Sequence, residues 1–365
     1  MNNNSTEPNI FHFATKELSQ DAFLCWLLSW ANKEYNQTET KDFYNFAQIF
    51  IQKTTGRNDL TLHKISRQEK HIDILLELKD TKGNLYAIVI EDKVFTQEHD
   101  QQIERYVKEI KNIASENIYI MYFKTGFTSE QEKRRLTNSY KNIYICGHDE
   151  IHRLFEKHPN HYLFNQWFSK ISKDYEQIEK YLKNSDYANV FTNKNECEMA
   201  CALDKITSNI INNTKFQKSY WYIVDQGHTP HICLYEKYSK NIDGFTIHNA
   251  IYLMFRGKSY NISVKQHICE LDVLTCKDFT GSSGKGIKSR IRIKDYDKLP
   301  QNLILTKENM RNSIERATDW QVKRKSEKDN LMIIQKSFLY GEDISLNIIK
   351  ETPNIEKIIQ IIENL

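Results

Sequence analysis

The chain has 365 residues, 39% of them hydrophobic and 27% charged, which is the balance of a folded globular protein and excludes a disordered one. No apolar run approaches the ~18 residues of a membrane span, so we expect no membrane partner. The net charge of +3 excludes a uniformly basic surface, so nucleic-acid binding has to depend on local clusters of basic residues. The length is sufficient for two domains.

The N-terminal sequence and the cysteines indicate the compartment. The opening residues MNNNSTEPN are polar and do not resemble a signal peptide. The seven cysteines are odd in number and lack paired zinc spacing, and His228, His231 and Cys233 form only a weak zinc candidate. We therefore expect a cytoplasmic protein with reduced cysteines.

The first predicted element is an amphipathic helix in the segment KELSQDAFLCWLLSW. Ser19 is a typical N-cap, and the apolar residues after it recur at helical spacing. Glu17 then lies just before the helix. Two roles stay open for this acid: an exposed charge that favours the helix dipole, or a further carboxylate if the helix start packs over the acidic corner described next.

A β-hairpin is predicted between residues 71 and 93. Alternation in residues 71–79 places Ile72, Ile74, Leu76 and Leu78 on one face and Asp73, Leu75, Glu77 and Lys79 on the other. The sequence DTKGN signals a turn, and LYAIVIEDK is apolar on both faces until its end, as in a central strand. Glu91 and Lys93 therefore share a face, and Asp92 points the other way.

The turn also predicts the register of the hairpin. A loop centred on Lys82 puts Asp73 opposite Glu91, beside Lys93. Opposed carboxylates repel each other and destabilise a sheet, so this corner needs cations, and Mg²⁺ favours one or two carboxylates together with water and phosphate oxygens. The alternative is a pair of ordinary solvated acids at strand ends. These acids close a very apolar run, where burial is costly unless the charges are paired, and this favours the metal site. Both interpretations stay open.

A second amphipathic helix is predicted from residue 97 to residue 110, where Ile103, Tyr106, Val107 and Ile110 recur at helical spacing. Gln102 and Tyr106 are one turn apart and face the same way. A tyrosine on such a face belongs more often to the core than to a catalytic site.

These motifs resemble the PD-(D/E)XK nuclease superfamily, whose signature is an Asp followed by (D/E)-x-K at the end of the next strand. Here Asp73 and Glu91-Asp92-Lys93 match, while Ile72 stands at the nominal proline. The sequence QIERY resembles the Q-x-x-x-Y element of RecB-like nucleases. The segment KELSQDAFLCWLLSW resembles the opening helix of a bacterial subgroup in which a Glu precedes the helix. The resemblance covers residues 14–125.

The resemblance implies a restriction-endonuclease-like α/β core, with a mixed central sheet flanked by helices. It also implies a nuclease that uses Mg²⁺ or Mn²⁺ to hydrolyse phosphodiester bonds, with DNA as the expected substrate and defence, restriction or repair as the expected role. The implied catalytic residues are Asp73, Glu91, Lys93, Gln102 and Tyr106, and the implied metal ligands are Asp73, Glu91, Asp92 through its carbonyl, and Glu17. One or two metals, and a monomer or a homodimer, stay open.

The rest of the chain is predicted more coarsely. Apolar strands at 117–125 and 142–147 extend the sheet, and helices follow at 151–157 and 165–183. We place the domain boundary at 184, in a polar stretch, giving a nuclease-like domain of residues 1–184. Residues 185–365 then form an α+β accessory domain with a helix at 196–212, strands, and helices near 306–320 and 353–364, which could bind substrate or a partner.

Two clusters of basic residues are candidates for contact with nucleic acid. Arg134 and Arg135 lie in the polar segment SEQEKRRL, and Lys285, Lys288 and Arg290 lie in the glycine-containing segment GSSGKGIKSRIRIK. Backbone amides and cations in such a loop can hold phosphates, although the spacing is not that of a Walker A loop. An ordinary solvated hairpin loop is the alternative for the second cluster.

Three functions remain compatible with the sequence. The first is a metal-dependent nuclease, the second a nucleic-acid-binding protein that does not cleave, and the third a regulatory protein in which the acids are structural. The intact set of Asp73, Glu91 and Lys93 favours the first.

Overall fold

The computed structural model describes residues 9–12, 17–96, 102–114, 117–224, 229–238, 245–256, 259–270, 301–325, 332–340 and 344–364. The chain divides into two compact units, Met1–Lys180 and Tyr181–Leu365, which are described separately. Within these described ranges, no helix is both long enough and apolar enough to cross a membrane.

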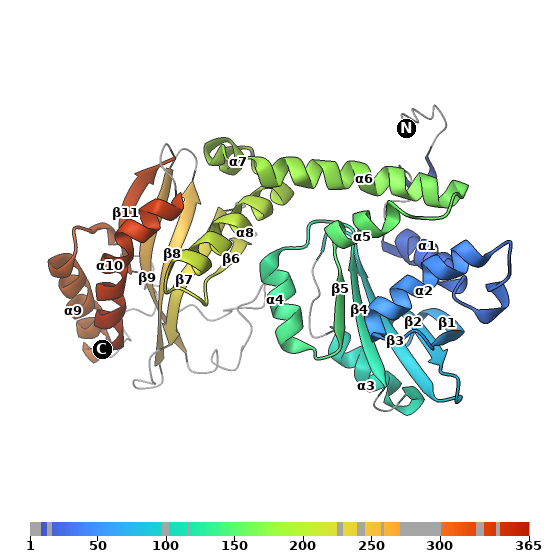
Figure 1. The fold of residues 1–365 in the computed structure, drawn as a ribbon. Helices are drawn as coiled ribbons and strands as arrows, with labels where there is room; N and C mark the ends of the chain where they lie inside the picture. Colours follow the sequence, from blue (N-terminus) through green and yellow to red (C-terminus); the bar gives the residue numbers. More distant parts are fainter. Residues whose placement is uncertain are drawn as a thin grey trace. The chain divides into compact units, whose positions relative to one another are not determined.

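The first unit contains a five-stranded mixed sheet (Figure 1). Its strands are β1 (Thr61–Glu69), β2 (Ile72–Lys79), β3 (Leu85–Lys93), β4 (Ile118–Lys124) and β5 (Ile143–Cys146), in the order β1-β2-β3-β4-β5. The first two pairings are antiparallel and the last two are parallel. The central position of β3 explains why its sequence is apolar on both faces.

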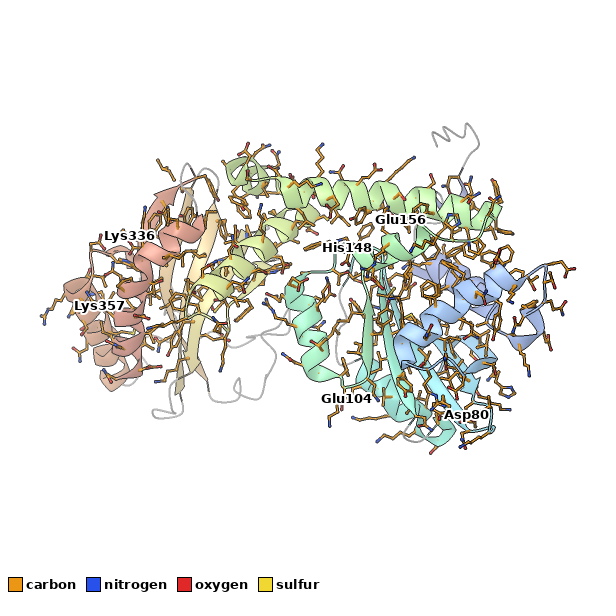
Figure 2. The ribbon with its side chains drawn as sticks, in the orientation of Figure 1. Asp80, Glu104, His148, Glu156, Lys336 and Lys357 are labelled. Carbon is orange, nitrogen blue, oxygen red and sulfur yellow. The ribbon has the colours of Figure 1, made fainter. Side chains whose placement is uncertain are left out.

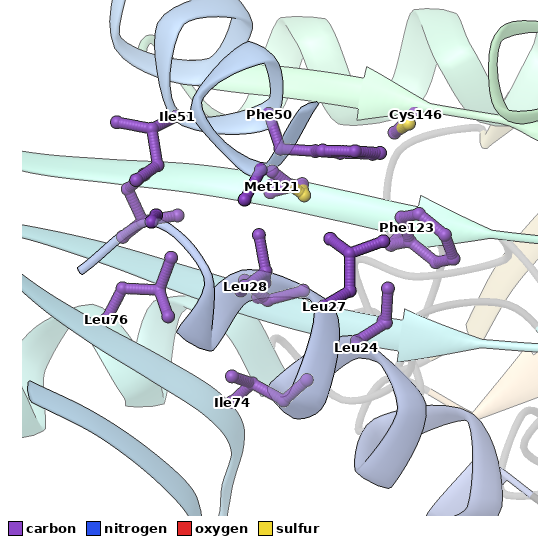
Figure 3. Packing of buried hydrophobic residues seen from close by; sticks show 14 of the residues in the cluster. Leu24, Leu27, Leu28, Phe50, Ile51, Ile74, Leu76, Met121, Phe123 and Cys146 are labelled. Atoms are coloured by element: carbon purple, nitrogen blue, oxygen red, sulfur yellow. The ribbon is translucent and has the colours of Figure 1, made fainter. Parts of the chain in front are cut away.

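Helices cover both faces of this sheet. One face carries α1 (Glu17–Ser29), α2 (Lys41–Thr55), α5 (His148–Phe155) and α6 (Tyr162–Lys183), and the other carries α3 (Gln102–Ala114) and α4 (Glu130–Ser139). Figure 3 shows the first face, where side chains of α1 and α2 pack with those of β2 and β4. The predicted α/β core, with a mixed sheet flanked by helices, is confirmed.

The predicted register of the hairpin is confirmed for its regular pairs, which do not include the predicted pair Asp73–Glu91. The β2–β3 pairs run from Ile74–Ile90 to Lys79–Leu85, which leaves a five-residue loop centred on Lys82. Asp80 fixes this loop, because its Oδ1 accepts the backbone N–H groups of Lys82 and Asn84 at 2.9 Å. Asp80 and His148 lie at opposite ends of the sheet (Figure 2).

Some local predictions were wrong or incomplete. Ser19 is not an N-cap, because α1 already begins at Glu17. The polar segment with Arg134 and Arg135 forms the helix α4. The side chain of Ser129 caps this helix by accepting the backbone N–H of Glu132. Strand β1 and helix α2 were not predicted. Two short 3₁₀ helices, η1 (Ile10–His12) and η2 (Lys33–Tyr35), complete the described part of the unit.

The second unit is an α+β domain, as expected. Its strands are β6 (Tyr220–Val224), β7 (Thr229–Tyr238), β8 (Phe245–Arg256), β9 (Ser259–Glu270), β10 (Gln321–Lys325) and β11 (Met332–Leu339), paired antiparallel in the order β10-β11-β9-β8-β7-β6. Its helices are α7 (Tyr187–Asn193), α8 (Glu196–Asn213), α9 (Gln301–Ala317) and α10 (Ile344–Glu363). Residues from α8, α9 and α10 form one core with the sheet.

Candidate active site

Three oxygen atoms converge on the ammonium of Lys93 at the end of β3. Lys93 Nζ forms an ion pair with Glu91 Oε1, lies 3.9 Å from Asp73 Oδ2 and lies 3.3 Å from the carbonyl oxygen of Asp92. The side chains of Lys93 and Glu91 are 7% and 0% exposed, whereas that of Asp73 is 15% exposed. The structure therefore gathers two carboxylates, one carbonyl and one cation in a corner that opens to solvent at Asp73.

The charges in this corner keep Lys93 protonated. Burial alone would lower the pKa of the ammonium, but the negative charges of Glu91, Asp73 and Glu17 more than offset it, and the pKa is raised above its usual value. The acids outnumber the base, so the corner as a whole attracts further positive charge.

Asp73 lies one residue beyond the last regular pair of the hairpin. The register continues from Ile74–Ile90 toward Asp73–Glu91, but the carboxylate of Asp73 instead accepts the backbone N–H of Asp92 at 3.1 Å through Oδ2. This hydrogen bond turns one oxygen of Asp73 toward the end of β3. The two carboxylates therefore meet at the Lys93 ammonium.

Helix α3 brings Gln102 and Tyr106 to the same face of the sheet. The Gln102 amide donates a hydrogen bond to the Tyr106 hydroxyl, as expected for residues one turn apart. Tyr106 is 2% exposed and packs with Val89 of β3, and burial raises the pKa of its phenol, followed by the charges of Glu91 and Asp73. The phenol therefore stays protonated beside the acids.

Glu17 reaches the edge of this corner. Its Oε1 accepts hydrogen bonds from the Thr96 hydroxyl at 2.9 Å and from the Val94 backbone N–H at 3.5 Å. Among the described residues, no group of three or more His, Cys, Asp or Glu side chains is arranged to hold a metal ion. Glu17 is close enough for its charge to act on Lys93, and its role as a further metal ligand stays a prediction.

The other face of β3 carries a buried polar network that sequence reasoning missed. The Gln20 amide donates to Asp92 Oδ1 at 2.6 Å and to the Lys93 carbonyl at 3.1 Å. Its oxygen accepts from the Thr125 hydroxyl at 2.9 Å. Asp21 shares a hydrogen bond with Asp92, and burial raises the pKa of both carboxyls, that of Asp92 well above its usual range. Two adjacent buried acids are stable when one of them keeps its proton.

A sequence signal for this network existed. Gln20 and Asp21 lie in helical register with Leu24, Leu27 and Leu28, so they belong to the face of α1 that packs on the sheet. Polar residues at such positions are buried and need partners.

A second buried pair, Lys124 with Glu132, lies beside the corner and was also missed. Lys124 donates to both carboxylate oxygens of Glu132, at 2.9 and 3.1 Å, and the Tyr122 hydroxyl donates to one of them at 2.6 Å. Tyr122 and Lys124 pair in register with Glu91 and Lys93 of the neighbouring strand.

Of the two predicted basic clusters, the one with Arg134 and Arg135 lies within the described residues. Arg134 is exposed on α4 and Arg135 is half-buried, while their neighbour Lys133 contacts Glu130 and Asp149. The cluster of Lys285, Lys288 and Arg290 lies outside the described residues, as does His228 of the weak zinc candidate. Phe95, two residues after Lys93, is 74% exposed and was not predicted as a site residue.

Comparison with known proteins identifies the family. A model described as the PD-(D/E)XK nuclease superfamily matches residues 8–203, more than half of the chain. The chain belongs to the PD-(D/E)XK nuclease superfamily. Membership implies nuclease activity, with nucleic acid as substrate, and members of the superfamily typically use divalent metals. No curated protein and no solved structure matches the chain.

The donor atoms of this PD-(D/E)XK corner fit a hard divalent cation. Glu91 Oε1, Asp73 Oδ2 and the Asp92 carbonyl are all oxygen atoms, and all three already surround one cation, the Lys93 ammonium. Mg²⁺ and Mn²⁺ prefer oxygen ligands, and Mg²⁺ needs only one or two carboxylates when water and phosphate complete its shell.

Proposed function

We propose that this protein is a metal-dependent nuclease that hydrolyses phosphodiester bonds in DNA with Mg²⁺ or Mn²⁺. The observation that carries the proposal is the convergence of Asp73, Glu91 and the Asp92 carbonyl on Lys93, in a chain of this superfamily. Asp73, Glu91 and the Asp92 carbonyl would hold the metal. A bound divalent ion supplies Lewis acidity and an activated water at neutral pH.

The side chains around this position have separate tasks. Lys93 is charged and held beside the acids, so it orients the attacking water or stabilises negative charge on the phosphate. Tyr106, with its phenol protonated and fixed by Gln102, donates a hydrogen bond to a phosphate oxygen or to the nucleophile. Glu17 steadies the charge of Lys93 and remains a candidate further ligand.

Basic and aromatic side chains are the proposed contacts with the nucleic acid. Arg134 and Arg135 on α4, and Lys285, Lys288 and Arg290, supply positive charge for phosphates. The exposed ring of Phe95 offers a surface on which a base can stack. Selection of substrate or partner by the accessory domain, action in the cytoplasm, homodimer formation, and a role in defence or repair stay predictions.

The competing function is a nucleic-acid-binding or regulatory protein on the same scaffold. Such a protein would have the nuclease fold but would not cleave phosphodiester bonds. The complete set of Asp73, Glu91 and Lys93 argues against this function.

Incubation of the purified chain with single- and double-stranded DNA and RNA tests the proposal, with Mg²⁺, Mn²⁺ or EDTA present. We expect metal-dependent cleavage of DNA that Asp73→Ala and Lys93→Ala each abolish. Equal cleavage by both variants and the wild type would refute the site. Salt-sensitive binding without any cleavage would support the competing function.

A further inference from the structure

Gln68 lies directly across from Asp73 in the β1–β2 hairpin. The flanking pairs Arg67–Ile74 and Glu69–Ile72 fix this register. The Gln68 side-chain amide donates two hydrogen bonds, one to Asp73 Oδ1 at 3.3 Å and one to Asp21 Oδ2 at 3.1 Å. One amide therefore joins the acidic corner to the buried network of α1.

The backbone at Gln68 is in an unusual conformation for a strand. Its φ is +55°, in the left-handed region that costs free energy for any residue with a side chain. The next two residues of positive φ, Lys70 at +55° and His71 at +64°, form the two-residue turn between Glu69 and Ile72, and such turns require positive φ at both positions. Gln68 lies before this turn, so the turn does not explain its conformation.

Both oxygens of Asp73 are held by groups outside its own strand. Oδ1 accepts from Gln68, and Oδ2 accepts from the Asp92 backbone N–H at 3.1 Å. Asp21 holds the amide of Gln68 from the other side, and Asp21 itself is 1% exposed and fixed on α1 beside Asp92. The orientation of the Asp73 carboxylate thus depends on a chain of contacts from α1 through Gln68.

We infer that Gln68, anchored by Asp21, is a positioning residue that orients the Asp73 carboxylate for metal binding. The inference rests on the metal site of the proposed function. A ligating carboxylate is itself hydrogen-bonded in well-ordered metal sites, and loss of such an outer contact weakens metal binding or activity by about 10- to 100-fold. Backbone strain at a residue that aims its amide at a candidate ligand is the arrangement expected of a functional position.

A pair of glycine substitutions separates positioning from structure. Gln68→Gly and Lys70→Gly each relieve a φ of +55°, but only the first removes a contact with Asp73. In the full chain, we expect both variants to melt at or above the wild-type temperature. Isothermal titration with MnCl₂ should show a dissociation constant about tenfold larger for Gln68→Gly than for the wild type. For Lys70→Gly the dissociation constant should be unchanged. Gln68→Ala, which keeps a β-carbon, should weaken Mn²⁺ binding to the same extent.

The anchor is tested by a double-mutant cycle on Mn²⁺ affinity. Because Asp21 acts through Gln68, Asp21→Ala combined with Gln68→Ala should bind Mn²⁺ no more weakly than Gln68→Ala alone. Wild-type affinity in Gln68→Gly and Gln68→Ala overturns the inference, and additive losses overturn the role of Asp21. A wild type that binds Mn²⁺ without cleaving any nucleic acid refutes the nuclease alone, since the titration still decides the role of Gln68. A wild type that binds no Mn²⁺ refutes both.

Discussion

Two buried lysine–glutamate pairs lie side by side on neighbouring strands of the first unit. Lys93 of β3 and Lys124 of β4 are register partners, and each forms an ion pair with a buried glutamate. Lys124 binds both oxygens of Glu132, and the Tyr122 hydroxyl adds a further hydrogen bond. The side chains of this second pair are 2% and 1% exposed, so it is closed to solvent.

The pair at Lys93 differs in its surroundings rather than in its residue types. Asp73 adds a second carboxylate that is 15% exposed, and Glu17 adds a third negative charge nearby. Excess acid and access to solvent allow this corner to take up an additional cation, whereas the closed pair is electrically balanced. The comparison indicates that the surroundings of the ion pair distinguish Lys93, for which a catalytic role is proposed, from Lys124.

The largest expected effect comes from Glu91→Gln. This change removes one proposed metal ligand while preserving shape, so we expect cleavage to fall on the order of 10³-fold or more. The free energy of unfolding should change by less than ~1 kcal/mol, because Asp73 and Glu17 still balance Lys93. Single-turnover cleavage and urea denaturation measure the two quantities. A variant that cleaves like the wild type would show that Glu91 is not a ligand.

The same chemical change at the closed pair should act on stability. Glu132→Gln leaves the Lys124 ammonium buried without its counter-charge, and removal of one partner of such a pair costs about 3–5 kcal/mol. Urea denaturation should show this loss, while the folded fraction keeps cleavage within several-fold of the wild type. If Glu132→Gln instead unfolds like the wild type and loses cleavage, the closed pair belongs to the active site and the comparison fails.

The two regions also differ in how well the sequence predicted them. The corner of Asp73, Glu91 and Lys93 follows from one hairpin, because alternation and a five-residue turn fix which residues meet. The contacts of Gln20 with Asp92 and of Gln68 with Asp21 join residues 72 and 47 positions apart. No local period encodes such contacts, since they depend on how α1 packs against the sheet.

Glu132 illustrates a different limit. It lies in a segment of high charge that sequence reasoning treated as a polar surface cluster, yet the helix α4 buries it against Tyr122 and Lys124. Burial of a single acid within such a segment depends on its tertiary partner, which the local composition does not reveal. The roles proposed for the site residues and for the basic clusters stay predictions.

The smallest expected effect is a pH response of His148, the first residue of α5. His148 is buried, and its Nδ1 accepts the Thr128 backbone N–H, which requires an unprotonated nitrogen. Burial lowers the pKa of His148 to about 4, and the nearby charge of Asp149 opposes this shift only in part. The unfolded chain takes up this proton near pH 6.5, whereas the folded chain resists it, so stability is complete above that pH and is lost as the pH falls toward 4.

The predicted loss is about 2 kcal/mol between pH 7.5 and pH 5. His148→Asn keeps an acceptor for the Thr128 backbone N–H and removes the titrating ring. Between pH 7.5 and pH 5, its free energy of unfolding should therefore fall by about 2 kcal/mol less than that of the wild type. Urea denaturation at several pH values measures the free energy of unfolding of the wild type and the variant. The Asp and Glu residues present in both proteins contribute equally, so the difference between the two profiles reports on His148. Parallel pH profiles would show that His148 takes up its proton equally in the folded and unfolded chain, and the surroundings of His148 would then be more open to water than its burial implies.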